Sequence, residues 1–269
     1  MSSYVVTGVS RGIGFEFLRQ LSSDPANTVI GLVRDPASTK AKVAELKRNN
    51  IHILKGDLED YQSLKDAAAE TTKITGGSLD YLIGNAAFIS HFSGFDGFGA
   101  LGTDPVALEN DLMTSFKTNV VGNVHLINLF MPLILKGKKK KVIIISSGMA
   151  DDSLTAKYEI EGGGPYSISK SGVNTVVVKF SAEYAKDGVL FMSICPGIVD
   201  TGNFDNLTEH QQQKAGVVFQ KFAAYAPNFA GQARPEDSVK AVISVYEKAS
   251  VANGDGGSFV SHTGTDKWL

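Results

Sequence analysis

The chain has 269 residues, 43% of them hydrophobic and 20% charged, with a formal net charge of −2. This balance is ordinary for a globular protein and gives no electrostatic reason to expect a nucleic acid or an anionic membrane as partner. Cys195 is the only cysteine, which excludes an intrachain disulfide, and the five histidines lack the spacing of a zinc site, so we expect no metal. The start of the chain leaves no room for a signal peptide, and no apolar stretch approaches the roughly 20 residues of a membrane span. We therefore expect a cytoplasmic protein.

Short apolar runs alternate along the chain with longer segments of helical pattern. Strands are expected at Tyr4–Thr7, Thr28–Val33, Ile51–Leu54, Tyr81–Ile83, Val142–Ile145, Val189–Ile194 and Ser258–Val260. Helices are expected at Gly12–Ser22, Pro36–Asn49, Asp60–Thr75, Asp104–Leu135, Tyr166–Lys186 and Pro235–Lys248. Several strands are continuous in Val, Ile and Leu, which is typical of parallel strands covered on both faces. The alternation predicts right-handed βαβ units and an α/β fold of the Rossmann type, a doubly wound parallel sheet of about seven strands with helices on both faces.

The chain shows no internal repeat and no low-complexity linker, so residues 1–269 are expected to form one domain. Three segments, 88–103, 151–164 and 203–234, interrupt the regular alternation, and the first of them is rich in Gly and Phe. Long irregular segments in compact α/β folds are often lids or binding loops, although aromatic residues can equally pack a loop onto the body or form a subunit contact. The basic run Lys138–Lys141 is expected to be a solvated turn.

A glycine-rich turn joins the first expected strand to the first expected helix. Glycines at this position let the chain turn tightly and let a pyrophosphate approach the backbone, while the free amides of the helix N-terminus attract the anion. The turn therefore predicts a dinucleotide site, with contacts from Gly8, Ser10, Arg11, Gly12, Ile13 and Gly14. The motif beginning at Thr7 reads T-G-x-x-x-G-x-G and resembles the pattern of the short-chain dehydrogenase/reductase family.

The residues at the end of the second expected strand indicate which nicotinamide cofactor binds. A carboxylate there would bind the adenosine ribose hydroxyls and favour NAD, but the position is occupied by Val33, and Arg34 follows it. Arg34 and Arg11 together would favour a ribose 2′-phosphate, and in the resembling family basic residues at these places mark members that prefer NADP(H). Two alternatives stay open: Asp35 could take the role of the acid, and both arginines could be ordinary surface residues. We expect NADP(H).

Tyr166 and Lys170 are spaced i and i+4, so on a helix they share one face. A nearby ammonium would lower the pKa of the phenol toward the range in which it can exchange a proton with a substrate oxygen. An isolated Tyr-x-x-x-Lys pair is unspecific, but Ser146 and Ser147 end an apolar strand at the same edge of the sheet. Ser147 matches the catalytic serine of the resembling family. Asn119 matches its asparagine, which supports a water that links the lysine to solvent.

Further motifs extend the resemblance over nearly the whole chain. In the family, the corresponding residues lie near the adenine, the ribose, or the nicotinamide and phosphates; here they are Asp57, Leu58, Asn85, Ala86, Tyr166, Lys170, Pro196, Gly197, Val199 and Thr201, with Lys170 as the anchor of the ribose. Asp57 is equally well explained as a turn residue that starts a helix. Gly84 and Ala87 depart from the family's Asn-Asn-Ala-Gly. The separation of Ser147 from Tyr166 is longer than usual, and the extra segment, 151–164, is expected to be either a flap over the substrate or a solvent-exposed insertion.

The resemblance implies an NADP(H)-dependent oxidoreductase that transfers hydride between the nicotinamide and a ketone or aldehyde, or an alcohol in reverse. Segment 88–102 and Trp268 resemble carbonyl-reductase-like, sniffer-type members, and the Phe-rich segment is compatible with an apolar or aromatic substrate. Two other functions remain open on such a fold: a non-catalytic NADPH-binding sensor or scaffold, and a non-redox lyase or isomerase. The resemblance also implies a homodimer or homotetramer formed through the helices at 104–135 and 166–186.

Overall fold

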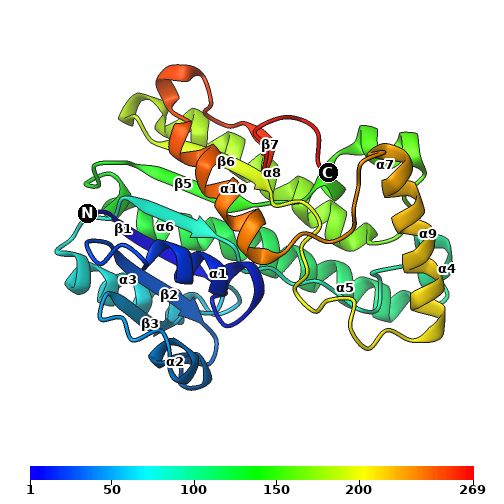
Figure 1. The fold of residues 1–269 in the computed structure, drawn as a ribbon, viewed down its shortest axis with the longest axis horizontal. Helices are drawn as coiled ribbons and strands as arrows, with labels where there is room; N and C mark the ends of the chain where they lie inside the picture. Colours follow the sequence, from blue (N-terminus) through cyan, green and yellow to red (C-terminus); the bar gives the residue numbers. More distant parts are fainter.

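The computed structural model describes residues 1–269, and all seven strands belong to one sheet (Figure 1). Their order is β3-β2-β1-β4-β5-β6-β7, and every neighbouring pair is parallel. The strands are β1 (Ser3–Thr7), β2 (Thr28–Val33), β3 (Ile51–Lys55), β4 (Tyr81–Gly84), β5 (Lys141–Ile145), β6 (Leu190–Cys195) and β7 (Phe259–Ser261). The order reverses between β1 and β4, which makes the sheet doubly wound. The predicted α/β fold is therefore confirmed.

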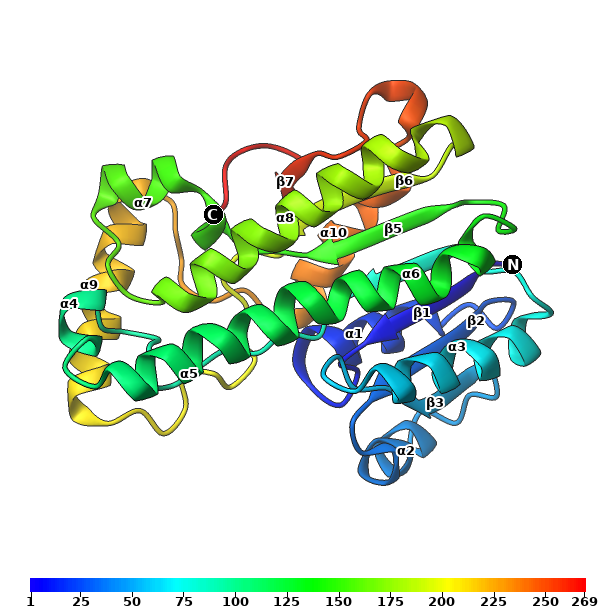
Figure 2. The same ribbon diagram turned by 180° about the vertical axis from the view of Figure 1, so that it is seen from behind.

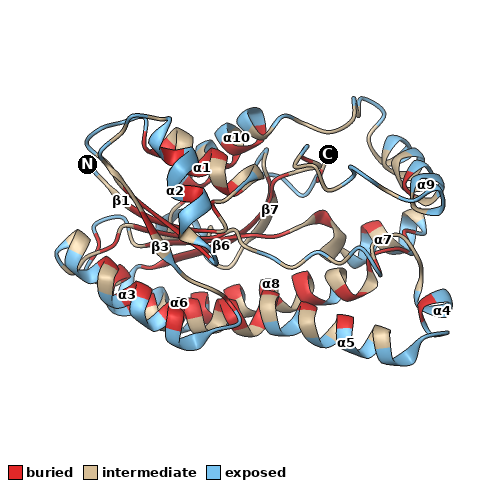
Figure 3. Cartoon of the chain, turned by 90° about the horizontal axis from the view of Figure 1, so that it is seen from below, coloured by how far each residue is buried: buried red, intermediate tan, exposed pale blue.

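Helices cover both faces of the sheet, with α1, α2 and α10 on one face and α3, α6 and α8 on the other (Figure 3). The helices are α1 (Gly12–Leu21), α2 (Pro36–Ala44), α3 (Tyr61–Thr75), α4 (Phe98–Leu101), α5 (Pro105–Phe116), α6 (Gly122–Ile134), α7 (Asp152–Tyr158), α8 (Gly164–Tyr184), α9 (Glu209–Tyr225) and α10 (Pro235–Lys248). None of them is both long and apolar enough to cross a bilayer.

Successive side chains of each central strand enter two separate cores. On β4, Tyr81 and Ile83 join the core under α1 and α10, whereas Leu82 joins the core under α6 and α8. On β5, Ile143 faces the first core and Ile144 the second. Because side chains alternate along a strand, a strand that is buried on both sides needs an unbroken apolar run, and this is the pattern that identified the strands.

The helix expected at 104–135 is in fact α5 and α6 joined end to end by a π-helical turn, Lys117–Val121 (Figure 2). Such turns are rare and are frequent at functional sites. The helix expected to end at Asn49 ends at Ala44. The amides of the next three residues, 45–47, donate to main-chain oxygens three residues earlier instead of four, and Lys47 takes a left-handed conformation with φ of 52°.

All three segments expected to be irregular contain helices. Segment 151–164 holds α7, which Asp151 caps by accepting hydrogen bonds from two main-chain amides. Segment 203–234 holds α9, which begins with a capping box between Thr208 and Gln211. Ala215 is the only buried residue of α9. The sequence of this helix therefore lacks the apolar residues at helical spacing that mark a helix packed on a core. Segment 88–103 contains only the short helix α4.

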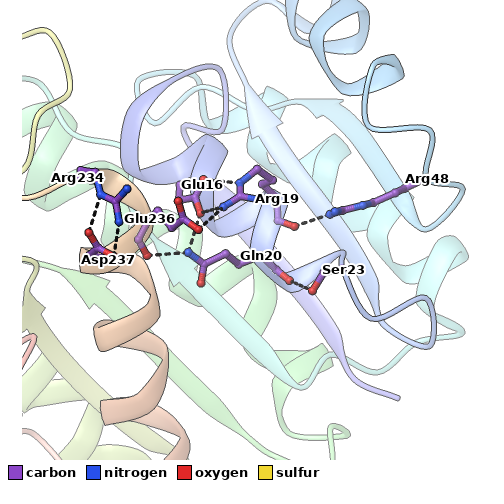
Figure 4. A network of polar contacts seen from close by, with 8 residues as sticks. All are labelled: Glu16, Arg19, Gln20, Ser23, Arg48, Arg234, Glu236 and Asp237. Carbon is purple, nitrogen blue, oxygen red and sulfur yellow. Dashed lines mark hydrogen bonds and ion pairs between the residues drawn. The ribbon is translucent and has the colours of Figure 1, made fainter.

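A polar network joins α1 to α10 on the outer surface of one helical layer (Figure 4). Both oxygens of Glu16 accept hydrogen bonds from Arg19, each at 2.7 Å, and Gln20 donates to the main-chain oxygen of Glu236 at 2.9 Å. Arg48 donates to the main-chain oxygen of Arg19 and thereby connects the segment after α2 to the same helix. The contacts run between neighbouring helices, so we interpret the network as a structural tie between them.

Lys141 corrects the expectation that the basic run 138–141 is a solvated turn. Lys138 and Lys139 are exposed, but Lys141 is buried at the start of β5. Its ammonium donates to the main-chain oxygens of Tyr246, Glu247 and Ala249 at 2.7, 3.1 and 2.9 Å. These carbonyls are at the C-terminal end of α10, where a positive charge is favourable. Burial lowers the pKa of Lys141, and the nearby Glu247 opposes this in part.

Replacing Lys141 with Met should destabilise the protein, because three carbonyls at the end of α10 would lose their donor inside the structure. We expect the free energy of unfolding to fall by about 2–4 kcal/mol, measured by urea denaturation. The matched control is Lys139→Met, which removes a charge from an exposed position of the same run. Equal stability of the two variants would contradict the structural role of Lys141.

Candidate active site

The reversal of strand order places the ends of β1 and β4 side by side at the centre of the sheet, the position at which open α/β folds bind ligands. Thr7, the last residue of β1, fixes the two strand ends to each other. Its hydroxyl oxygen accepts hydrogen bonds from the main-chain amides of Asn85 and Ala86 at 3.0 and 2.9 Å. The side-chain amide of Asn85 donates to the main-chain oxygen of Thr7 at 2.9 Å. The predicted segments Gly8–Gly14 and Asn85–Ala86 are therefore brought together.

The glycines of the turn are required by backbone conformation and by close packing. Gly8 and Gly12 have φ of 74° and 55°, in the left-handed region that other residues rarely adopt. A Cβ atom on Gly14 would lie 2.2 Å from the main-chain oxygen of Gly8 and 2.5 Å from the amide nitrogen of Asn85. A Cβ atom on Gly12 would lie 3.0 Å from Cγ2 of Thr201, so the loop after β6 packs directly on the turn. No side chain caps the N-terminus of α1, and its free amides can hold an anion.

The basic residues expected at the adenosine end are exposed. Arg11 and Arg34 form no ion pair or side-chain hydrogen bond within the chain. Asp35, the alternative acid, caps α2 by accepting a hydrogen bond from the amide of Ala37 at 3.0 Å. Lys42 of α2 was not expected at this site, yet its ammonium donates to the main-chain oxygen of Ser10 at 3.2 Å. Lys42 lies eight residues after Arg34 and belongs to no recognised motif, so the sequence did not indicate this contact.

Asp57 and Leu58, which follow β3 after Gly56, have structural contacts in this region. The carboxylate of Asp57 accepts a hydrogen bond from the amide of Glu59 at 3.1 Å, and its main-chain amide donates to the Ser63 hydroxyl at 2.9 Å. This is the turn geometry considered as the alternative for Asp57. Leu58 is buried, and a Cβ atom on Gly122 would lie 2.6 Å from its Cβ atom. Because its side chain is buried, Leu58 could contact a cofactor only through its main chain.

Tyr166 and Lys170 lie on the first turns of α8, facing the end of β5. The Lys170 ammonium is buried and donates to the main-chain oxygen of Ile145 at 2.7 Å, and it lies 5.6 Å from the centre of the Tyr166 ring. Ile145 is the last residue of β5, and Ser147 follows it by two positions. The sheet edge and the helix thus bring together the three side chains that the spacing singled out.

Burial controls the protonation of this pair. It lowers the pKa of Lys170 to about 8. It raises the pKa of Tyr166 well above the ordinary value; Cys195 adds to this effect, and the Ser147 hydroxyl opposes it. The expectation that Lys170 lowers the pKa of the phenol is therefore not met. Burial of the hydroxyl is the largest influence on its pKa, and the Lys170 ammonium is engaged with the main-chain oxygen of Ile145. The phenol is held in its protonated form.

Asn119 lies in the π-helical turn and connects the segment after β4 with α8. Its side-chain oxygen accepts from the amide of Phe88 at 2.7 Å, and its side-chain nitrogen donates to the Phe88 oxygen at 3.0 Å and to the Ser169 hydroxyl at 2.9 Å. Ser169 in turn donates to the main-chain oxygen of Tyr166 at 2.7 Å. The amide of Asn119 is thus fully engaged within the protein.

The loop after β6 carries the last group of expected contact residues. Gly197 has φ of 80°, and a Cβ atom there would lie 3.0 Å from the ring of His262, whose Nδ1 is buried without a partner. The main-chain oxygen of Pro196 accepts from the hydroxyl of Ser238 at 2.7 Å, and Val199 pairs with Ala233. His262 and Ser238 were not predicted, since they lie far along the sequence and belong to no motif.

The structure explains one of the two departures from the family pattern. A Cβ atom on Gly84 would lie 2.5 Å from Cδ1 of Ile144 and 2.7 Å from the side-chain oxygen of Asn123. Asn123 is buried, and its amide nitrogen donates to the main-chain oxygen of Asn119 at 2.8 Å. The space that an asparagine at position 84 would need is thus filled by Ile144 and Asn123. Ala87, the other departure, is exposed.

Gly84→Ala should destabilise the protein by about 1–3 kcal/mol, because the added methyl group would overlap Ile144 and Asn123. On an Asn123→Ala background the same substitution should cost less, with a coupling of at least about 0.5 kcal/mol, since one of the two obstacles is removed. Denaturation of the two single variants and the double variant measures the coupling. Strict additivity would show that Asn123 does not occupy the space in question.

Comparisons with known proteins agree with this architecture. A family model described as short chain dehydrogenase matches residues 3–212. The chain is 59% identical to the short chain dehydrogenase virK of Hypocrea virens and 49% identical to the short-chain dehydrogenase/reductase iacC of Pestalotiopsis fici, with 100% of each chain covered. Two solved structures share its fold over 98% of both chains: an NADPH-bound carbonyl reductase from chicken fatty liver (TM-score 0.78, 22% identity) and the carbonyl reductase Sniffer of D. melanogaster (TM-score 0.76, 20% identity). By the family match and by these relatives, the chain belongs to the short-chain dehydrogenase/reductase family and is an oxidoreductase.

Proposed function

We propose that the protein reduces a ketone or aldehyde with NADPH, or oxidises the alcohol in reverse, with Tyr166 as the proton donor and acceptor. The observation that carries this proposal is the grouping of Tyr166, Lys170 and Ser147 at the carboxyl edge of the sheet, the same edge that carries the glycine turn. When bound, the nicotinamide would supply or receive the hydride at its C4 carbon. The NADPH-bound carbonyl reductase of similar fold supports the same reaction class.

The chain offers matching groups for each part of the cofactor. The free amides at the start of α1 and the left-handed glycines suit the pyrophosphate, and Thr201 lies against the same turn. Arg11 and Arg34 are exposed and unpaired, which leaves both guanidinium groups available for a 2′-phosphate. Asp35 is engaged in capping α2, so a competing role with the ribose hydroxyls is less well supported. These features favour NADP(H) over NAD(H).

The pKa directions at the site fit carbonyl reduction. A phenol with a raised pKa stays protonated at neutral pH and can donate its proton to the carbonyl oxygen as hydride reaches the carbon. The Ser147 hydroxyl would donate a hydrogen bond to the same oxygen and hold it in place. Lys170, with a pKa of about 8, is mostly charged at neutral pH and would stabilise the phenolate left behind. Asn119 would act by holding α8 through Ser169.

We also propose that two or more copies associate through α5 and α8. These helices pack against each other and carry exposed apolar side chains, among them Met113 (62% exposed) and Ile168 (50% exposed). Several such residues on adjacent helices are unusual for a surface in contact only with water. Val106, Phe116 and Val178 belong to the same set.

Tyr166→Phe should lower kcat for carbonyl reduction by about 10²–10⁴-fold, because the proton donor is lost while the ring remains. The measurement is NADPH oxidation with a panel of ketones, quinones and aldehydes, together with product identification. NADPH affinity should fall far less than kcat, since only the hydroxyl is lost. Tyr184→Phe, at the opposite end of α8, is the matched control and should retain activity. Full turnover by Tyr166→Phe, or product formation without NADPH consumption, would refute the mechanism.

Arg34→Gln should lower kcat/KM with NADPH by about 10- to 100-fold, the loss expected for one charged hydrogen bond to phosphate, and should leave the value with NADH nearly unchanged. Lys40→Gln provides the control, since Lys40 is an exposed cation on the nearby helix α2 without a contact to the turn. Equal efficiency of the unmodified enzyme with NADH and NADPH would contradict the cofactor assignment, whatever the variants do.

A further inference from the structure

Trp268 is buried, although it is the second-last residue of the chain. Its side chain is 4% exposed, and its ring stacks on Phe259 with ring centres 4.3 Å apart. The indole nitrogen donates to Oδ2 of Asp151 at 2.7 Å, and the main-chain amide donates to the hydroxyl of Tyr225 at 3.0 Å. Both N–H donors of the residue are thus paired with side chains from distant parts of the sequence.

The two partners of Trp268 belong to the helices that were not predicted. Asp151 is the N-cap of α7. Its Oδ1 accepts hydrogen bonds from the amides of Ser153 and Leu154, and its Oδ2 accepts from the indole of Trp268. Tyr225 is the last residue of α9, and its ring meets Tyr158 of α7 edge to face at 5.4 Å. Trp268 therefore joins α7 and α9, which lie together beyond the carboxyl ends of the strands (Figures 1 and 2).

Helix α9 has few other buried attachments. Its ion pairs, His210 with Asp96 and Lys214 with Glu161, involve mostly exposed side chains. Exposed ion pairs contribute little to stability, typically about 0–1 kcal/mol. Ala215 is its only buried residue. The contact at Tyr225 is therefore an important anchor for the C-terminal end of this helix.

The same indole also contacts the turn that follows Ser147. A Cβ atom on Gly148 would lie 2.8 Å from both Cβ and Cγ of Trp268, so only glycine allows the two segments to approach this closely. The amide of Gly148 donates to the sulfur of Cys195 at 3.1 Å, and Cys195 belongs to the same small apolar cluster as Trp268. The turn that orients Ser147 is thus held between β6 and Trp268.

We propose that Trp268 is a positioning residue for the carbonyl substrate: it fixes α7 and α9 against the turn that carries Ser147 and so shapes the substrate side of the active site. The inference rests on the proposed carbonyl reduction. Trp268 contacts none of the segments assigned to the adenosine and pyrophosphate, which are the glycine turn, Arg34 and the end of β4. Its loss should therefore affect substrate recognition and leave cofactor binding intact.

Each of two substitutions removes one hydrogen bond of Trp268. Tyr225→Phe preserves the packing, whereas Trp268→Phe keeps an aromatic ring against Phe259 but replaces the buried indole with a smaller side chain. Trp268→Phe removes the donor to Asp151, and Tyr225→Phe removes the acceptor for the Trp268 amide. For each we expect KM to rise about tenfold, the effect of roughly 1.4 kcal/mol, with kcat changed much less. The substrate is the panel compound that the unmodified enzyme reduces fastest. Equilibrium binding of NADPH should stay within about twofold of the unmodified value. Tyr158→Phe is the matched control, because Tyr158 packs on Tyr225 but its hydroxyl has no hydrogen-bond partner.

Hydrogen exchange of the ligand-free protein provides a second readout that does not need turnover. In Trp268→Phe, amides of α7 and α9 should exchange faster, and amides of β5 and β6 should not. Unchanged KM in Trp268→Phe and Tyr225→Phe would overturn the proposal, as would a matching loss of NADPH affinity, which would indicate general destabilisation. If the unmodified enzyme reduces no compound of the panel, the proposed function fails. The exchange rates alone then decide whether Trp268 couples the two helices, and unchanged rates would overturn that coupling.

Discussion

The side-chain amide of Asn119 joins segments that are far apart in the sequence, and the geometry of the candidate site depends on it. Its oxygen and nitrogen form a pair of hydrogen bonds with the main chain of Phe88, just beyond β4, and the nitrogen also reaches Ser169 on α8. Ser169 holds the main-chain oxygen of Tyr166. A buried amide with all of these partners is costly to displace, so the phenol, the helix that carries it and the strand end move as one unit.

The π-helical turn explains how Asn119 reaches both partners. An extra residue in the helical repeat changes the direction of the side chains that follow. The main-chain oxygen of Asn119 accepts a hydrogen bond from the side-chain nitrogen of Asn123. Asn123 in turn occupies space that Gly84 leaves open. The departure from the family motif at position 84 is thereby linked to the packing beneath Asn119.

The two ends of the site are built in different ways. At the cofactor end, main-chain segments approach one another so closely that glycines are required, and Thr7 holds the strand ends together. At the proposed substrate end, α7 and α9 are helices of the outer surface. They are attached by exposed ion pairs, by the hydrogen bonds of Trp268 and by the small apolar cluster that contains Leu154 and Trp268. Close main-chain packing thus holds the proposed cofactor end, whereas contacts between side chains of distant segments hold the proposed substrate end.

The sequence alone was enough to predict the strands, most of the helices that cover the sheet and the grouping of the glycine turn, Ser147, Tyr166 and Lys170. Unbroken apolar runs and helical spacing are local patterns, and strand ends of a parallel sheet must meet at one edge. Helix α9 was missed because it buries a single residue and so has no apolar stripe.

Tertiary structure alone decided that Lys141 caps α10, that Lys42 reaches Ser10 and that Trp268 links α7 to α9. Each of these contacts joins residues whose separation along the chain carries no periodic signal. The same holds for the raised pKa of Tyr166, since desolvation depends on every segment that packs around the hydroxyl and not on the spacing to Lys170.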